Sequence, residues 1–207
     1  MVHTETFGIR SGQRVLDVGC GIRPYPFATH LADIEVVHAW RGVRRRVPSA
    51  GREFVQCTVE DLPFPDGWFD FVYCAHVLEH VRDPARACRE LMRVGARGYV
   101  ECPRSWLEYV SSADDHRWLV DCEGGVLIFR EKLEEERRDF FGLRFRLLAW
   151  IEDPLFVTYW NLPRIRRVRN VELTWEGRFP FLVLTRADRR GSGRNLPAPP
   201  HKPRAPR

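Results

Sequence analysis

The chain has 207 residues, of which 44% are hydrophobic and 29% charged, and a formal net charge of +5. This length suits one domain with a single buried core. No apolar run reaches the roughly 20 residues of a membrane-spanning helix, and the sequence opens without a basic, apolar secretory signal. We therefore expect a cytoplasmic protein with no membrane span.

The positive charge is concentrated at the C-terminal end. From Arg186 onward the chain has seven basic residues and one acid, so the body before it has a net charge of −1. This end is also rich in Pro and Gly, a composition typical of disorder. We predict a folded domain over residues 1–185, a disordered basic tail over residues 186–207, and no nucleic-acid-binding face.

The first half of the chain predicts strands that alternate with compact connections and one helix. Apolar and β-branched runs predict strands at residues 14–18, 27–33, 53–57, 69–74 and 97–102. Asp83 and Pro84 are typical of a helix start and Gly95 of a helix end. Residues 41–49 are interpreted as a basic loop. This order favours a mostly parallel sheet in an α/β fold.

The second half predicts antiparallel additions to this sheet, or a lid over its edge. Strand-like runs around Gly-containing turns predict two hairpins, at residues 118–129 and 171–184. A charged helix is expected between them, around residues 132–139. We divide the domain into a motif-bearing half, residues 10–103, and an acceptor-side half, residues 104–185.

A glycine turn and a carboxylate are the first candidate site residues. Gly19-Cys20-Gly21 follows the first strand, where open α/β sheets bind ligands and a glycine lets the backbone approach them closely. The third glycine of the dinucleotide fingerprint is absent, which argues against NAD or FAD. Asp33 ends the second strand, where a carboxylate either binds the ribose of a nucleoside or is simply solvated.

The chain resembles the class I S-adenosylmethionine-dependent methyltransferases, within the group labelled methyltransferase type 11. The resemblance covers Val15 to about Pro103 and rests on four segments in order: VLDVGCG at 15–21, EDLPFPD at 60–66, HVLEHV at 76–81 and RELMRV at 89–94. It implies a Rossmann-like methyltransferase fold, S-adenosyl-L-methionine as the cofactor, and methyl transfer to an unidentified small-molecule or glycan-like acceptor.

The resemblance also implies a cofactor site at the ends of the first four strands. The predicted cofactor-binding residues are Asp17, Gly19, Cys20, Gly21, Asp33, Thr58, Val59, Glu60 and Cys74. The turn at 19–21 is expected to hold the methionine part, Asp33 the ribose, and the 58–60 loop the adenine. Two departures stand out: Thr58 replaces the usual Asp, and the first helix is nearly absent, which makes Glu35 the alternative to Asp33.

His76 and His116 are the predicted catalytic residues. Methyl transfer to a hydroxyl needs a proton acceptor, and histidine has a reference pKa near 6.5 that suits this role. His76 follows the fourth strand, and Asp115 is expected to orient His116. The alternative is that no side chain acts as a base and that His116 only anchors its loop.

His76, Glu79 and His80 form the H-x-x-E-H pattern, which is also that of inverzincin peptidases. On a helix the three side chains would share one face. Some methyltransferases with E-x-x-E-H in this loop bind a divalent ion, and here His76 replaces the first acid. We favour simple hydrogen bonding of the loop by Glu79 and His80, and name no metal ligand.

Two other functions stay open. A non-catalytic binding protein that keeps the methyltransferase fold would account for Thr58 and for the missing first helix. A metal-dependent hydrolase would account for the H-x-x-E-H pattern but would leave the other motifs unexplained.

Overall fold

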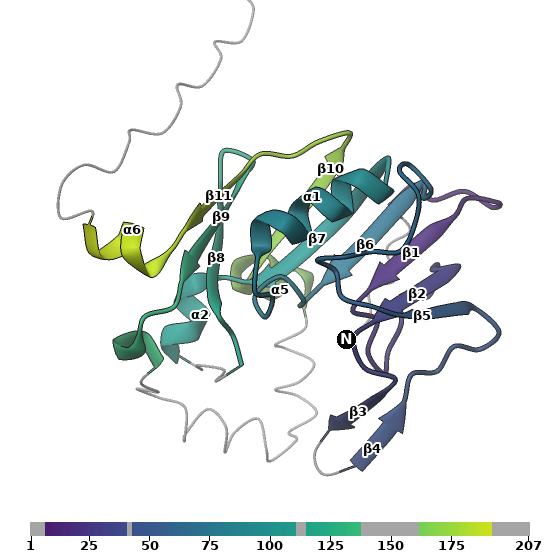
Figure 1. Cartoon of the computed structure of the whole chain (residues 1–207), viewed down its shortest axis with the longest axis horizontal. Helices are drawn as coiled ribbons and strands as arrows, with labels where there is room; N and C mark the ends of the chain where they lie inside the picture. The colour runs from purple at the N-terminus through teal and green to yellow at the C-terminus, as the bar shows by residue number, and fades with distance from the viewer. Residues whose placement is uncertain (1–6, 41–42, 111–114, 138–161, 192–207) are drawn as a thin grey trace, which may run out of the picture.

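The central feature of the computed structural model, which describes residues 7–40, 43–110, 115–137 and 162–191, is a six-stranded sheet (Figure 1). Its strand order is β10-β7-β6-β1-β2-β5. Neighbours among β1, β2, β5, β6 and β7 pair in parallel, whereas β10 is antiparallel to β7. The strands are β1 (Val15–Val18), β2 (His30–Asp33), β5 (Glu53–Gln56), β6 (Phe71–Ala75), β7 (Arg97–Pro103) and β10 (Asn170–Glu176).

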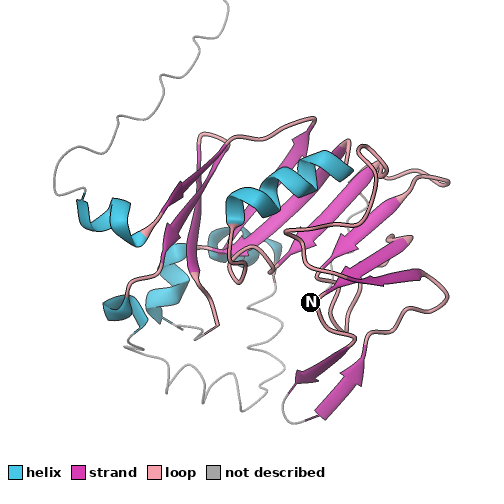
Figure 2. Ribbon diagram, viewed as in Figure 1, coloured by secondary structure: helices cyan, strands magenta, loops and turns pink. Residues whose placement is uncertain are grey.

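Two smaller sheets flank this central sheet, as the strands in Figure 2 show. In the three-stranded sheet, β8 is antiparallel to β9, and β11 pairs in parallel with the other edge of β9. A separate hairpin joins β3 and β4 at the opposite end of the molecule (Figure 1). The strands are β8 (Trp118–Glu123), β9 (Val126–Glu131), β11 (Phe181–Leu184), β3 (Val37–Trp40) and β4 (Val43–Arg46).

The helix α1 (Pro84–Val94) has clear local signals at both ends. The Asp83 carboxylate accepts from the Arg86 amide at 2.9 Å, Pro84 needs no amide partner in the first turn, and Gly95 ends the helix. Its apolar stripe packs on one face of the central sheet. The other helical segments among the described residues are α2 (Ser105–Val110), a 3-10 turn at Glu134–Arg137, α5 (Pro163–Arg169) and α6 (Arg186–Gly191).

None of the helices in the described residues is long and apolar enough to cross a membrane.

The two faces of the central sheet are packed in different ways. On the α1 face, helix and sheet residues such as Leu91 and Val100 form one core with the three-stranded sheet. On the other face, aromatic rings dominate. Phe7 stacks on Tyr99 with ring centroids 4.6 Å apart, and Tyr25 stacks on Tyr73 at 4.3 Å. Loop residues thus supply much of the packing on this second face.

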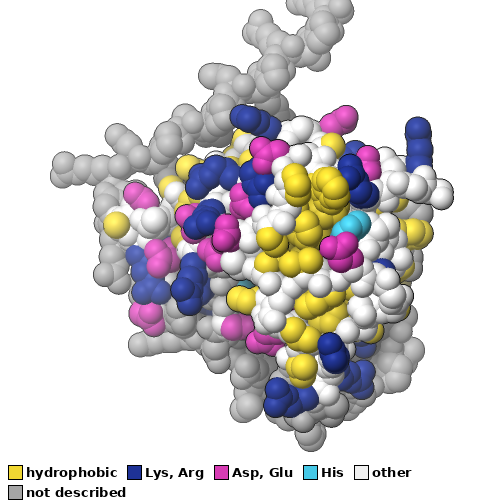
Figure 3. All heavy atoms as spheres, turned by 45° about the vertical axis from the view of Figure 1, so that its right-hand side comes forward, with side chains coloured by type: hydrophobic (Ala, Val, Ile, Leu, Met, Phe, Trp, Pro, Cys, Tyr) yellow, Lys and Arg dark blue, Asp and Glu magenta, His cyan; other side chains and the backbone are white. Residues whose placement is uncertain are grey.

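The surface in Figure 3 has charges of both signs around an exposed band of hydrophobic side chains. Exposed hydrophobic residues of the described chain include Phe27, Ile34 and Trp68. A nucleic-acid-binding surface typically gathers basic residues on one face. The face in this view does not have that pattern.

The predicted α/β class is confirmed, and α1 begins and ends where Asp83, Pro84 and Gly95 predict. The hairpin at residues 118–129 is also confirmed as β8 and β9. The second strand is shorter than predicted, because it begins at His30 and not at Phe27.

Three other predictions are wrong. Residues 171–184 do not form a hairpin: β10 joins the central sheet beside β7, and β11 joins the small sheet beside β9. The predicted basic loop at 41–49 contains β4, and the predicted charged helix is a short 3-10 turn within the described residues. Arg186–Gly191, at the start of the predicted tail, forms α6, and residues 192–207 lie outside the described residues.

Candidate functional site

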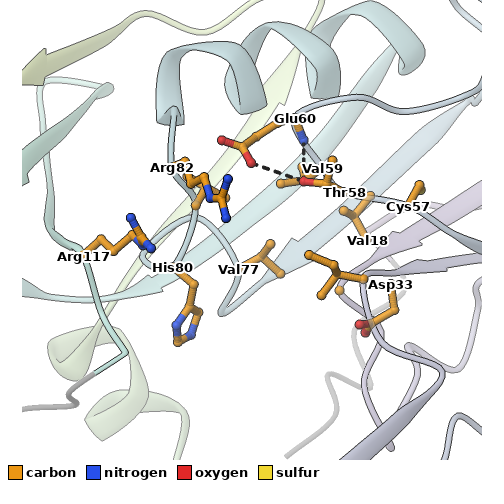
Figure 4. Close-up of a pocket in the computed structure, with 13 residues that line it drawn as sticks. Val18, Asp33, Cys57, Thr58, Val59, Glu60, Val77, His80, Arg82 and Arg117 are labelled. Carbon is orange, nitrogen blue, oxygen red and sulfur yellow. Dashed lines mark hydrogen bonds between the residues drawn. The ribbon is translucent and has the colours of Figure 1, made fainter.

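A pocket lies where the carboxyl ends of β1, β2, β5 and β6 lead into loops. Parallel pairing brings these ends to one edge of the sheet, so residues far apart in sequence become neighbours. The pocket has a volume of about 190 Å³. Figure 4 shows its lining, which includes Val18, Gly19, Asp33, Ile34, Thr58, Val59, Glu60, Val77, His80, Val81, Arg82 and Arg117.

In the glycine turn after β1, the backbone of Gly19 lies very close to the Val77 side chain. Gly19 has a φ of +69°, and its amide donates to the Ala32 carbonyl at 2.7 Å. A Cβ placed on Gly19 would lie only 2.2 Å from Cγ2 of Val77, in the loop after β6. Gly21 also has a positive φ, of +54°, but a Cβ there meets no atom within 4 Å.

These two glycines provide a matched pair of variants. We expect Gly19→Ala to destabilise the protein by about 2 kcal/mol more than Gly21→Ala, because only Gly19→Ala adds overpacking to backbone strain. Chemical denaturation of both variants measures this difference. Equal losses of stability would show that Val77 moves aside without cost.

Asp33 ends β2 as a buried carboxylate at the pocket wall. Its Oδ2 accepts from the Gly21 amide at 2.8 Å, and its Oδ1 accepts from the Glu35 amide at 2.9 Å. His38 Nε2, on β3, lies 3.2 Å from Oδ2. The Cys20 thiol also lies 3.9 Å from Oδ2. Each carboxylate oxygen offers about two acceptor positions, so a further donor would meet Asp33 at Oδ1, where the Glu35 amide is the neighbour.

The loop after β5 is held by its own side chains, as the dashed lines in Figure 4 show. The Thr58 hydroxyl donates to Glu60 Oε2 and accepts from the Glu60 amide, both at 3.3 Å. The other oxygen of Glu60 accepts from the Asp83 amide at 2.5 Å. The loop is therefore fixed against the start of α1, while its Val59 lines the pocket.

The structure separates the predicted cofactor-binding residues into two groups. Gly19, Asp33, Thr58, Val59 and Glu60 line the pocket. Four others do not line it. These are Asp17, Cys20, Gly21 and Cys74.

Each residue of the second group makes other contacts in the fold. Cys74 is buried in the core on the α1 face. Cys20 and Gly21 contact Asp33, with the Cys20 thiol 3.9 Å from its Oδ2. Gly21 therefore acts on the pocket through the carboxylate that its amide holds.

Asp17 lies within β1, and its carboxylate is almost fully buried. It accepts from the Tyr25 amide at 2.7 Å, beside the aromatic rings on the face away from α1. Burial raises the pKa of the Asp17 carboxyl from its ordinary value to about 7, although the hydrogen bond from Tyr25 lowers it. Asp17 thus positions the loop between β1 and β2.

His76 follows β6 with an unusual φ of +57°. Its Nε2 lies 3.2 Å from Glu101 Oε1, and its Nδ1 lies 3.4 Å from Glu79 Oε1. Partial removal from water lowers the pKa of His76, but Glu101 and Glu79 outweigh this and raise it to about 9. Held in this way, the ring is protonated at neutral pH and is not poised to accept a proton.

His116 is oriented by a residue that the sequence analysis did not identify. Its Nδ1 lies 2.5 Å from Glu108 Oε1, whereas the predicted partner Asp115 contacts His80 instead. The second oxygen of Glu108 accepts from Lys132 Nζ at 2.8 Å, and the Lys132 side chain is fully buried. Burial lowers the pKa of His116, but the hydrogen bond and charge of Glu108 outweigh this effect, so the pKa lies above its ordinary value.

Residues 76–80 do not form the helix on which an inverzincin pattern depends. His76 is in the left-handed region, and α1 begins only at Pro84. His76 turns toward Glu101, whereas His80 lies near His116 with ring centroids 4.6 Å apart. The structure therefore groups Glu79 and His80 with His116, which lies just before β8. No sequence pattern indicates that His116 is their neighbour.

The sheet order and the loop positions define a Rossmann-like domain with a pocket at its ligand-binding edge. The family described as a methyltransferase domain matches residues 16–99. The ubiquinone biosynthesis O-methyltransferase of Acinetobacter baylyi is 30% identical over 190 residues, which cover 78% of this chain and 76% of that protein. The chain belongs to the class I S-adenosylmethionine-dependent methyltransferases.

Other similar proteins match over a smaller part of their length. The ubiquinone/menaquinone biosynthesis C-methyltransferase UbiE of Cellvibrio japonicus is 37% identical over 103 residues, which are 44% of this chain and 41% of that protein. The solved structure of the YcgJ protein from Bacillus subtilis has a TM-score of 0.38 and 27% identity, and the match covers 47% of each chain.

Proposed function

We propose that this chain binds S-adenosyl-L-methionine in the pocket at the ends of β1, β2 and β5 and transfers its methyl group to a small-molecule acceptor. The observation that carries the proposal is the placement of Asp33. This buried carboxylate lies on the same pocket wall as Gly19 and the loop from Thr58 to Glu60. A strand-end acid beside a glycine turn suits the ribose of a bound nucleoside.

The lining of the pocket fits the adenosyl part of this cofactor. Val18, Ile34, Val59 and Val77 provide apolar surface suited to the faces of an adenine ring. The volume of about 190 Å³ is below the roughly 300–1,000 Å³ of most ligand sites. The described pocket therefore suits the nucleoside, and the methionine part would extend from it along the turn at Gly19.

When bound, the cofactor supplies a methyl group that is already activated on a sulfonium. The protein then has to align the acceptor, keep water away and accommodate any proton that is released. His80, Arg82 and Arg117 line the end of the pocket away from Asp33, as Figure 4 shows. We propose that this end lies nearest to the acceptor.

His76 and His116 stay our candidates for residues that contact the acceptor. Both rings are held by buried carboxylates, at Glu101 and Glu108 respectively. This arrangement leaves Nε2 of His116 to face the acceptor, whereas both ring nitrogens of His76 already face carboxylates. A role as proton acceptor would require one of these ion pairs to open first.

Binding of S-adenosylhomocysteine, measured by calorimetry, tests the proposed cofactor site. We expect micromolar affinity for the full chain, and a loss of about 10-fold to 100-fold in Asp33→Asn, because a charge-assisted hydrogen bond of roughly 1–3 kcal/mol is removed. The matched control is Glu35→Gln, an exposed acid two residues away, which should bind as the parent does.

Two outcomes would change this proposal. A loss confined to Glu35→Gln would move the ribose contact from Asp33 to Glu35. No binding to the parent chain at millimolar ligand would contradict the cofactor assignment altogether.

A non-catalytic binding protein is the second candidate, and one feature of the fold favours it. Residues between Val18 and His30 form turns without a helix, so the cofactor loop has less support than a first helix would give it. This candidate predicts cofactor binding without turnover across a broad panel of acceptors. Release of S-adenosylhomocysteine that depends on any acceptor would exclude it.

A further inference from the structure

Glu79, His80 and His116 converge from two segments of the chain. Glu79 and His80 lie in the connection between β6 and α1, and His116 lies just before β8. One potential ligand atom of each residue lies within 4.8 Å of those of the other two. The two imidazole rings meet edge to face. Because His80 also lines the pocket, this cluster adjoins the proposed cofactor site.

Glu79 is a buried carboxylate whose nearest cationic neighbours within the described chain do not form hydrogen bonds with it. Its side chain is 1% exposed, and neither oxygen has a hydrogen-bond partner among the described residues. The nearest cationic atoms are His76 Nδ1 and His80 Nε2, at 3.4 and 3.9 Å from Oε1. An ionised carboxylate that is removed from water needs close donors or a bound cation. Glu79 is therefore incompletely satisfied by the protein alone.

Both histidines have Nδ1 beside an oxygen of another residue. His116 Nδ1 is held by Glu108, which Lys132 holds in turn. His80 Nδ1 lies 3.3 Å from the Asp115 carbonyl oxygen and 3.4 Å from its carboxylate. A proton on each Nδ1 leaves the lone pair on Nε2 free for a ligand. Histidines that bind metal ions are typically oriented by such carboxylate and carbonyl partners.

We propose that Glu79, His80 and His116 bind one divalent transition-metal ion, with Zn²⁺ as the reference ion. Two imidazole nitrogens and one carboxylate oxygen suit Zn²⁺ and its neighbours, whereas Mg²⁺ and Ca²⁺ favour all-oxygen sites. Three protein ligands leave a coordination position open. His76 lies outside the set because its Nε2 is held by Glu101.

The open position points to a use at the acceptor end of the pocket. A bound Zn²⁺ lowers the pKa of a coordinated hydroxyl and fixes its position. This use rests on the proposed methyltransferase function, but the binding of the ion does not.

Metal titration of the full chain tests the site directly. After treatment with a chelator and dialysis against Zn²⁺, we expect elemental analysis to find one ion per chain that survives desalting. Substitution with Co²⁺ should give the visible absorption of nitrogen and oxygen ligands. A thiolate-to-cobalt charge-transfer band would assign the ion to a cysteine and overturn the proposal, as would an ion lost on desalting.

Variants identify the ligands. We expect Glu79→Gln and His116→Asn each to weaken Zn²⁺ binding by about 100-fold or more, since loss of an outer partner alone costs 10-fold to 100-fold. His30→Asn, on β2, is the control and should bind as the parent does. If Glu79→Gln fails to fold, the partly exposed His116 still decides the question.

His76→Asn distinguishes this site from the H-x-x-E-H pattern. It should retain the affinity of the parent, because His76 does not belong to the cluster. A loss as large as that of His116→Asn would assign the ion to the loop and contradict the proposal. Calorimetry with S-adenosylhomocysteine on zinc-free protein reports separately on the cofactor, so failure of one proposal is distinguishable from failure of the other.

Discussion

Asp17→Asn is expected to become more stable relative to the parent as the pH rises from about 4 to about 7. Burial raises the folded pKa of Asp17 from 3.8 to about 7. The folded state therefore binds more protons than the unfolded state within this window, and the stability of the parent falls as Asp17 ionises. Above a pH of about 7 the cost is complete, on the order of 4 kcal/mol.

The variant removes this ionisation and keeps an oxygen that can accept from the Tyr25 amide. Urea denaturation of both proteins at several pH values measures the difference in unfolding free energy. Because other titrating groups contribute to both proteins, they largely cancel from this difference. A difference that does not change with pH would show that Asp17 titrates near its ordinary pKa in the folded state.

Gly98→Ala is expected to cost at least about 3 kcal/mol, the upper end of the usual range for overpacking. A Cβ on Gly98 would lie 2.4 Å from the Val72 carbonyl oxygen and 2.7 Å from the Trp175 ring. The first of these contacts is with backbone in the middle of the sheet, which a change of rotamer does not relieve. Thermal and chemical denaturation measure the loss.

Gly125→Ala is the matched control for Gly98→Ala. Gly125 lies in the turn between β8 and β9 at a φ of +83°, and a Cβ there meets no atom within 4 Å. Its cost should be limited to backbone strain, of about 1–2 kcal/mol. A Gly98→Ala protein as stable as the Gly125→Ala protein would show that β6, β7 and β10 separate easily at this point.

The sequence predicts those parts of the fold whose causes are local. Asp83, Pro84 and Gly95 act within one helix, so α1 follows directly from them. The segment from Val171 to Leu184 has an equally clear pattern, and yet the prediction of a hairpin is wrong. The alternation of apolar and polar residues in this segment indicates which side chains are buried, but it does not indicate which strand is the partner. In the structure the partner of β10 is β7, where Gly98 has no side chain and so leaves space for the Trp175 ring.

The candidate site also has one part that the sequence predicts and one part that it does not. Gly19, Asp33 and Thr58 each lie at or just after the end of a parallel strand, so their proximity at one edge of the sheet was predictable. His116 comes close to Glu79 because the start of β8 lies beside the loop between β6 and α1. The amides of Arg117 and Trp118 donate to the Glu79 carbonyl. Contacts of this kind depend on how the three-stranded sheet packs against the central sheet. The spacing of residues in the sequence does not indicate this packing.

The path of the last two strands has a consequence during synthesis on the ribosome. β10 completes the central sheet and β11 completes the small one. The central sheet therefore lacks a strand until Glu176 has left the exit tunnel, and the small sheet lacks one until Leu184 has left it. Pairing between strands that are far apart in sequence is slow. The nascent chain therefore exposes the edges of β7 and β9 until β10 and β11 have paired with them. We expect ribosome-bound chains released before β10 emerges to be degraded or to aggregate more readily than the full-length product.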